Sequence, residues 1–382
     1  MRTREEPREE VFFCCSFVCT LQDPCNAFPN CGVKIVKRVK FAPQPCSMRR
    51  KTLVFSFLIV LCVLLFALNI SIGSVAIPFK EVVKILFGEE GSKLSWTYII
   101  MISRLPGALT ALIAGAALAV SGLLVQTLFR NPLAGPSVLG ISSGASLGVA
   151  LVMLAAGGSM VISYSVVAAA AMCGAALVLF LVLLVAQRMR DNVTMLIFGL
   201  MAGYIISSVV SVLEFQSEDS ALRSFIHWSF GSFSGMTWQQ LQILALSVGV
   251  GAGLSFFVFK PMDAWLLGEE HAESVGVNTN VTRILVILIV GILAGAVTAF
   301  CGPIAFLGLA TPHLARGLWP ETRHLYAIPL VALVGAILAL LCDIISRSPG
   351  ATGVLPLNAV TSMVGAPVVI WVILRNRYRS LF

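Results

Sequence analysis

Residues 130–149 constrain the fold of this chain more than any other stretch, because they are polar and broken where their neighbours are apolar. The run RNPLAGPSVLGISSGASLGV contains a charge, two prolines and four glycines. It separates apolar segments of about 20 residues, the length that crosses a bilayer as a helix. Broken backbone at membrane depth is tolerated only inside protein or beside a water-filled cavity. The pattern therefore predicts a polytopic membrane protein with an enclosed interior, for which transport is the first hypothesis.

The composition indicates the same class. The chain is 58% hydrophobic and 12% charged, with a mean hydropathy of +0.94, whereas a soluble domain has about 25% charged residues. The formal net charge of +8 comes from basic residues scattered between apolar segments. Such scattering is typical of loop charges that set membrane orientation, and it argues against a nucleic-acid-binding surface.

Ten segments are candidates for membrane-spanning helices. Eight are strong: 53–72, 106–128, 164–186, 193–213, 240–259, 284–301, 327–346 and 356–374. Two are weaker, the Gly- and Ser-rich 137–155 and the short 303–312. Basic residues precede the first span (Arg49, Arg50, Lys51) and follow the last (Arg375, Arg377, Arg379), so both ends should be cytoplasmic and the number of spans even. The expected fold is an all-α polytopic membrane protein with about ten transmembrane helices.

The first 47 residues differ from the rest. They hold six of the ten cysteines, without a CxxC pair or a nearby histidine, so the sequence gives little support for a zinc site. A signal peptide would need a basic start and a small-residue cleavage site, and neither is evident. Met48 is followed by three basic residues and a long apolar run, as at a natural start. We expect residues 1–47 to be disordered or a product of a start codon assigned too far upstream, and 48–382 to form the ten-helix domain.

Catalytic patterns are sparse, which argues against an enzyme. The sequence has no P-loop, HExxH, GxSxG or paired intramembrane carboxylate, so ATP hydrolysis would need separate subunits. Asp343 is the strongest acidic candidate within a span, and we interpret it as a structural partner of Arg347, one helical turn away, rather than as a proton relay. An ion-coupled secondary transporter is therefore the second hypothesis, and an intramembrane enzyme is a distant third. No cofactor or metal site is expected.

The loop 260–282 is acidic on the side where basic residues dominate. Its segment AWLLGEEHAESVGV predicts a short amphipathic helix closed by Gly276. Such a helix is either a solvated loop element or a docking helix for a cytoplasmic partner.

Four motifs now occur in an order that resembles a known family. They are NPLAGPSVLGISSGASLG after a span beginning RLPG, LLGEEHAESVGV, GPIAFLGLATPHLAR and GAPVVIWVIL. The whole of 48–382 resembles the permease subunit of the bacterial ABC importers for iron-siderophores, haem and cobalamin. The motif positions that carry the resemblance are Asn131, Pro132, Gly140, Gly144, Gly302, Pro303, Pro312, His313, Gly365 and Pro367.

The resemblance implies a type II ABC importer permease-like bundle in the bacterial cytoplasmic (inner) membrane. It also implies a second permease subunit, in a homodimer or a pair of similar permeases. Two cytoplasmic ATP-binding subunits and an extracytoplasmic substrate-binding protein would complete the assembly. On family frequency the expected cargo is a ferric siderophore, with haem or cobalamin as alternatives.

The resemblance further implies roles for individual residues. The binding protein would dock on Arg104 and Arg347, while Gly107 stands where the family has a second arginine in the first of these motifs. The inner gate would fall at Asn192 and Val193, which lack the small hydroxyl groups that the family often has there. The residues that would contact the ATPase are Leu267, Gly268, Glu269, Glu270 and Ala272.

Overall fold

The structure is a computed structural model of the whole chain. The residues that it describes are 48–73, 75, 77–89, 91–155, 163–188, 192–319, 323–347 and 354–379. They belong to one compact unit, Met48–Phe382. The expectations for residues 1–47 fall outside the described residues.

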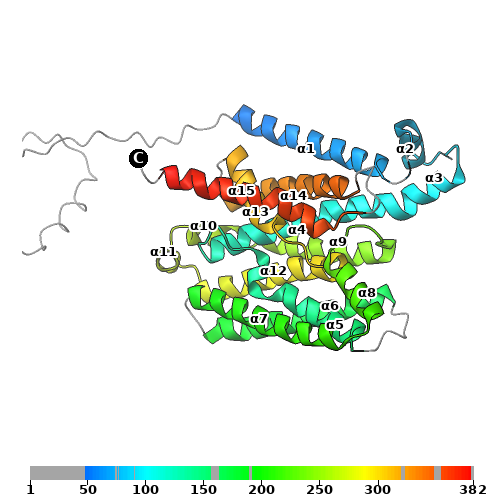
Figure 1. Cartoon of the computed structure of the whole chain (residues 1–382). Helices are drawn as coiled ribbons and strands as arrows, with labels where there is room; N and C mark the ends of the chain where they lie inside the picture. The colour runs from blue at the N-terminus through cyan, green and yellow to red at the C-terminus, as the bar shows by residue number, and fades with distance from the viewer. Residues whose placement is uncertain are drawn as a thin grey trace, which may run out of the picture. The chain divides into compact units, whose positions relative to one another are not determined.

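The described part of the chain is helical and contains no strand, as the sequence predicts. Eight long helices match the eight strong candidates: α1 (Met48–Ser71), α4 (Leu105–Leu128), α6 (Tyr164–Arg188), α7 (Asn192–Gln216), α9 (Trp238–Ser255), α12 (Thr279–Cys301), α14 (His324–Ser346) and α15 (Leu357–Arg379) (Figure 1). The weak candidates correspond to the shorter helices α5 (Ile141–Met153) and α13 (Leu307–Leu318). Among the described residues, six helices are long and apolar enough to cross a membrane alone, or seven if the bent pair formed by α9 and α10 (Phe259–Trp265) is one span.

Both short helices begin inside the bundle after irregular backbone. A 3₁₀ turn, η2 (Pro136–Leu139), and Gly140 at φ 72° precede α5. Before α13, Gly302 has φ 76° and Phe306 has φ 65°. The prediction of a helix over 303–312 was therefore wrong at its start, because left-handed backbone at Phe306 delays the helix to Leu307.

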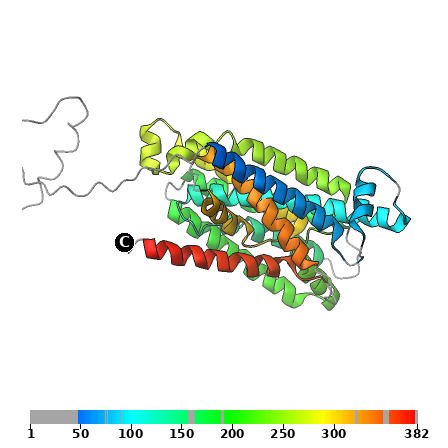
Figure 2. The same ribbon diagram turned by 90° about the horizontal axis from the view of Figure 1, so that it is seen from above.

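The long helices run side by side and leave short elements at two ends (Figures 1 and 2). One end carries α10 and α11 (Glu269–Ser274), together with the start of α1 and the end of α15. The opposite end carries α2 (Phe79–Leu86), α3 (Leu94–Tyr98) and α8 (Asp219–Ser229). A π-helical turn, Ile99–Arg104, joins α3 to α4.

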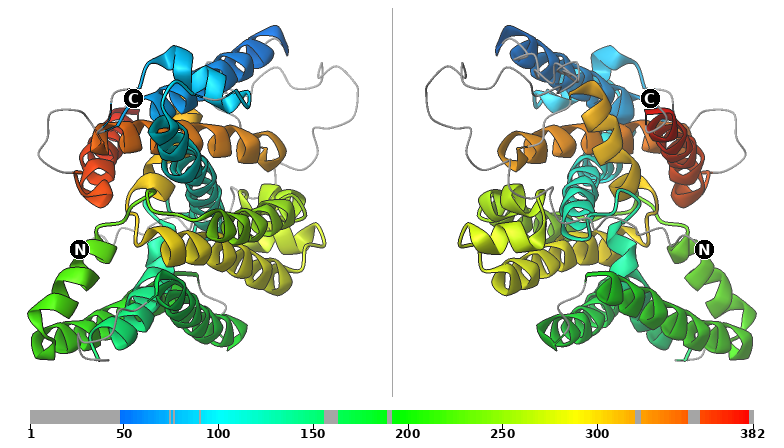
Figure 3. Two further views of the ribbon diagram at one scale, coloured as in Figure 1. Left: turned by 90° about the vertical axis from the view of Figure 1, so that its right-hand side faces the viewer. Right: turned by 90° about the vertical axis from the view of Figure 1, so that its left-hand side faces the viewer.

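Seen along the helices, α4 lies between the group α5 to α7 and the pair α14 and α15 (Figure 3). Burial follows this arrangement. The most apolar window is 78% buried in the span Leu94–Leu128, which includes α4, and in α12, whereas it is only 17% buried in α7. The outer face of α7 is apolar, as expected of a helix that faces lipid or a second subunit.

Glycines set the spacing between the central helices. A Cβ built on Gly122 of α4 would lie 1.7 Å from the carbonyl oxygen of Gly308 in α13. A Cβ on Gly115 would lie 2.4 Å from the carbonyl oxygen of Gly335 in α14. Small residues allow helix backbones to approach this closely, which strengthens van der Waals packing in a membrane.

Candidate functional site

The loop predicted to dock a partner forms two short helices rather than one. Gly268, at φ 121°, separates α10 from α11, so the prediction of one continuous helix was wrong. Gly276 has φ 88° and ends α11 as predicted. Its N–H donates to the carbonyl oxygen of Glu273 (2.9 Å), and the Val277 N–H donates to that of Ala272 (3.0 Å).

The five predicted ATPase contacts divide into exposed and buried groups. Leu267 is 69% exposed and Glu270 is also exposed. Gly268 and Ala272 are buried, while Glu269 forms an ion pair with the buried Arg283 of α12. Only Leu267 and Glu270 therefore present a largely free side chain to the surface.

Two buried contacts fasten this loop to the centre of the bundle. Trp265, which is fully buried, donates its indole N–H to the carbonyl oxygen of Leu128 at the end of α4 (3.1 Å). The guanidinium of Arg283 lies 5.8 Å from the centroid of the Trp265 ring. Together with the Glu269–Arg283 pair, these contacts join α10 to α4 and α11 to α12.

A hydrogen-bonded chain adds a third link, from α10 to α14 and α4. Asp263 accepts hydrogen bonds from the backbone N–H of His324 (2.7 Å) and pairs with its Nδ1 (2.7 Å). The Nε2 of the same ring lies 3.0 Å from the hydroxyl of Thr127. Partial burial acts to raise the pKa of Asp263, but the hydrogen bonds from His324 outweigh it and leave the pKa below its usual value.

This lowered pKa predicts an acid-labile link. Because the carboxylate is favoured in the folded state, its contribution is complete above the ordinary aspartate pKa of about 4 and is lost as the pH falls through the lower folded value. The protection factors of the α10 amides, which compare their exchange with the intrinsic rate at the same pH, should therefore fall in strong acid, and Asp263→Asn should lower them already at neutral pH. Equal exchange by the variant and the wild type at pH 7 would contradict a structural role for the carboxylate.

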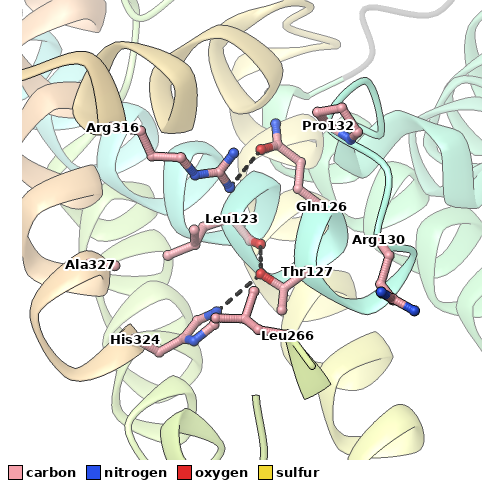
Figure 4. Close-up of a pocket in the computed structure, with 9 residues that line it drawn as sticks. All are labelled: Leu123, Gln126, Thr127, Arg130, Pro132, Leu266, Arg316, His324 and Ala327. Atoms are coloured by element: carbon pink, nitrogen blue, oxygen red, sulfur yellow. Dashed lines mark hydrogen bonds between the residues drawn. The ribbon is translucent and has the colours of Figure 1, made fainter. Parts of the chain in front are cut away.

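A cavity of about 250 Å³ opens beside this chain of hydrogen bonds (Figure 4). It lies between the ends of α4 and α13, the start of α14 and the segment after α10. Arg316 reaches across it and donates to the side-chain carbonyl of Gln126 (3.1 Å).

At the opposite end, the two arginines expected to dock a binding protein are held by their own chain. Arg104 is 4% exposed and donates to the carbonyl oxygens of Ile70 (2.9 Å), Ser71 (2.7 Å) and Val75. It thus satisfies carbonyls at and after the end of α1, a burial that differs from the outward position expected of a docking residue.

Arg347 forms an ion pair with Asp343, so the predicted pairing of these two residues is confirmed. Asn69 of α1 completes this cluster. Its amide donates to Asp343 Oδ2 (2.8 Å), and its carbonyl oxygen accepts from Arg347 Nη2 (2.6 Å). The cluster joins α1 to the end of α14. A polar asparagine within the apolar run of α1 was the available signal for it, since isolated polar groups in spans usually have partners.

The remaining motif residues shape the backbone. Nε2 of His313 in α13 lies 2.7 Å from the carbonyl oxygen of Pro132. The side-chain oxygen of Asn131 accepts a hydrogen bond from the Leu133 N–H (2.9 Å). A Cβ on Gly365 would lie 2.5 Å from Cβ of Phe306. The other motif glycines meet neighbouring backbone: Gly140 at Gly199, Gly144 at Gly174 and Gly302 at Trp228. Pro303 precedes α13, while Pro312 and Pro367 lie inside helices α13 and α15.

The predicted gate residues lie at the start of α7. Asn192 is its first residue, and the side chain of Val193 is 62% exposed. Their role as a gate stays a prediction.

Comparisons with known proteins identify clear relatives. A family model described as the FecCD transport family matches residues 61–375. The vitamin B12 import system permease protein BtuC of Vibrio cholerae is 39% identical over 277 residues, which are 72% of this chain and 82% of that protein. The hemin transport system permease protein HmuU of Yersinia pestis is 33% identical over 327 residues, 85% of this chain and 96% of that protein.

A solved structure has a similar fold. It is described as an inward-facing conformation of a putative metal-chelate type ABC transporter. The TM-score is 0.75 at 27% sequence identity, and the match covers 85% of this chain and 99% of the other.

Proposed function

Because this chain belongs to the FecCD transport family and is an ABC importer permease, we propose that it imports an intact metal chelate through a bacterial inner membrane. The observation that carries the proposal is the common chemistry of its relatives, whose names specify vitamin B12, hemin and a metal chelate. A ferric siderophore belongs to the same chemical class and is the cargo that the sequence favours. The bundle itself would act as a conduit, with cargo choice resting largely on a binding protein.

The partners follow from the same proposal. A second copy of the chain would cover part of the exposed apolar surface of α7. Two ATP-binding subunits would dock on the loop that carries α10 and α11, and a substrate-binding protein would dock at the α8 end. Basic residues support a cytoplasmic location for the α11 end and for both termini. Those at this end include Arg130, Lys260, Arg316 and Arg323.

The contacts of the loop suggest how motor movement reaches the pathway. When ATP binding brings the two motor subunits together, a force on α10 and α11 is passed to α4 through Trp265 and to α12 through the Glu269–Arg283 pair. These central helices then move as a rigid unit and change which side of the bundle is open. Arg104 and Arg347 are each held by other groups of the same chain, so docking through them would require these side chains to exchange partners. Arg223 of α8, by contrast, is already exposed.

Reconstituted vesicles test the proposal directly. Permease, ATPase subunits and binding protein from neighbouring genes would be supplied with radiolabelled vitamin B12, hemin and a panel of ferric siderophores. We expect ATP-dependent accumulation of one of these chelates and none by the permease alone. Accumulation by the permease alone, driven by a proton gradient, would instead establish a secondary transporter.

The coupling role of the loop predicts a sharp loss of uptake. Leu267→Asp combined with Glu270→Lys should lower ATP-driven uptake at least about tenfold, because it replaces an apolar contact and reverses a charge on the exposed docking surface. Glu269 is left intact, since its replacement would also leave the buried Arg283 without its ion-pair partner. Asn280→Lys, exposed at the same end, is the matched control and should transport normally. Normal uptake by the double variant would refute the docking role.

A further inference from the structure

The cavity beside Arg316 has an excess of positive charge. Arg130, Arg316 and His324 line it, and no acidic side chain lines it among the residues that the structure describes (Figure 4). Asp263, which lies outside the cavity, pairs with Nδ1 of His324 (2.7 Å). No ion pair joins either arginine to a carboxylate within the described residues. The two guanidinium groups therefore leave a local charge surplus at the cavity.

Arg316 is positioned rather than neutralised. Gln126 accepts one of its N–H groups (3.1 Å) and donates its own amide N–H to the carbonyl oxygen of Leu309 (3.1 Å). A neutral amide thus holds the guanidinium of this exposed residue without neutralising its charge. Arg130 lies beside Gly268, and a Cβ built on Gly268 would be 3.6 Å from one terminal nitrogen of the arginine.

We propose that this cavity binds a phosphate group, either of an anionic phospholipid or of a free phosphate. Guanidinium groups match the geometry and charge of phosphate oxygens. Basic pockets between helix ends on the cytoplasmic side of a membrane bind anionic lipid headgroups. Leu123, Leu266 and Ala327 add apolar walls that suit the glycerol and upper acyl region of a lipid.

The position of the site gives its occupation a consequence. Its lining joins the end of α4 to α13, to α14 and to Leu266 in the segment between α10 and α11. A bound phosphate would hold together the loop and the helices on which the loop acts. This role lies beyond cargo import, because it requires neither cargo nor a binding protein.

Two binding measurements on the purified full-length chain test the proposal. In the first, nanodiscs contain phosphatidylcholine with or without phosphatidylglycerol, and native mass spectrometry counts the retained lipids. In the second, inorganic phosphate is titrated onto detergent-solubilised protein while the thermal midpoint is followed. Retention of phosphatidylglycerol without stabilisation by inorganic phosphate would identify a lipid as the source of the bound phosphate group. Stabilisation by inorganic phosphate would identify the free anion.

Variants separate the cavity from general surface charge. Arg130→Gln with Arg316→Gln should weaken binding in the responding measurement at least tenfold. Arg188→Gln with Lys260→Gln removes the same charge at the same end from residues that do not line the cavity, and it should change binding less than twofold. Arg130→Lys with Arg316→Lys keeps the charge, and intermediate binding by this folded variant would support the proposal if the glutamine variant aggregates. Absence of binding in both measurements, or equal loss in the two charge-matched pairs, would overturn it.

Discussion

Replacement of Gly122 by leucine should almost eliminate the folded protein from membranes. Its Cβ would lie 1.7, 2.5 and 2.9 Å from three backbone atoms of Gly308, so no side chain can rotate out of the way. The backbones of α4 and α13 would have to separate, and the irregular segment that directly precedes α13 in the bundle would have to move with it. Overpacking by a few methylenes costs about 1–3 kcal/mol, and contact with fixed backbone should exceed that range. Membrane yield and the thermal midpoint measure the effect.

Gly249→Leu is the matched control for this substitution. Gly249 lies in α9 with no atom within 4 Å of a built Cβ, and it is exposed. The same side chain should there change stability by less than about 1 kcal/mol. If the Gly122 variant accumulated and melted like the control, α4 and α13 could not pack as closely as they do here.

The stripes of small residues illustrate how far the sequence predicts this fold. Small residues recur every four positions from Gly107 through Gly115 to Ala119 and from Gly140 to Gly148, a pattern that indicates helix faces able to pack closely. It could not supply the opposing residues. Gly115 packs against Gly335, and Gly144 packs against Gly174. In each pair the second glycine lies on another predicted span. Periodicity is a local property, whereas the pairing of helices depends on the whole bundle.

Backbone breaks were harder to predict than spans. The left-handed conformation of Phe306 has no sequence signature, so the predicted start of the helix over 303–312 was wrong. The amphipathic pattern continues across Gly268 and therefore predicts one helix, whereas the structure has two. Burial was missed for a similar reason. A lone arginine near a span end is usually exposed, yet Arg104 finds three carbonyls beyond the end of α1.

If the loop couples an ATPase to the bundle as proposed, the links at the α11 end would let these short helices act on the whole bundle. Trp265, Glu269 and Asp263 each join the loop to a different central helix, α4, α12 and α14. Force distributed over three helices displaces them together, whereas one attachment would permit local bending. The exposed residues between these anchors would then form the proposed docking surface, apart from the contacts that transmit the force.

Replacing Asp343 with alanine should produce the second large effect, a loss of about 3–5 kcal/mol of stability. It would leave the guanidinium of Arg347 without its carboxylate, although the side chains of both residues are almost entirely buried. Asn69 would keep its hydrogen bond to Arg347 (2.6 Å) but cannot neutralise the charge. Unfolding in denaturant, followed by the fluorescence of a dye that reports exposed thiols, measures the loss.

A double variant separates structure from function at this cluster. Asp343→Ala with Arg347→Met removes both charges, and it should recover most of the lost stability, because an apolar replacement of a buried pair is often nearly neutral. If Arg347 also docks a binding protein, this stable double variant should fold and still transport poorly. A proton relay predicts instead that Asp343→Ala abolishes transport without loss of stability, and that result would reverse the structural assignment of the pair.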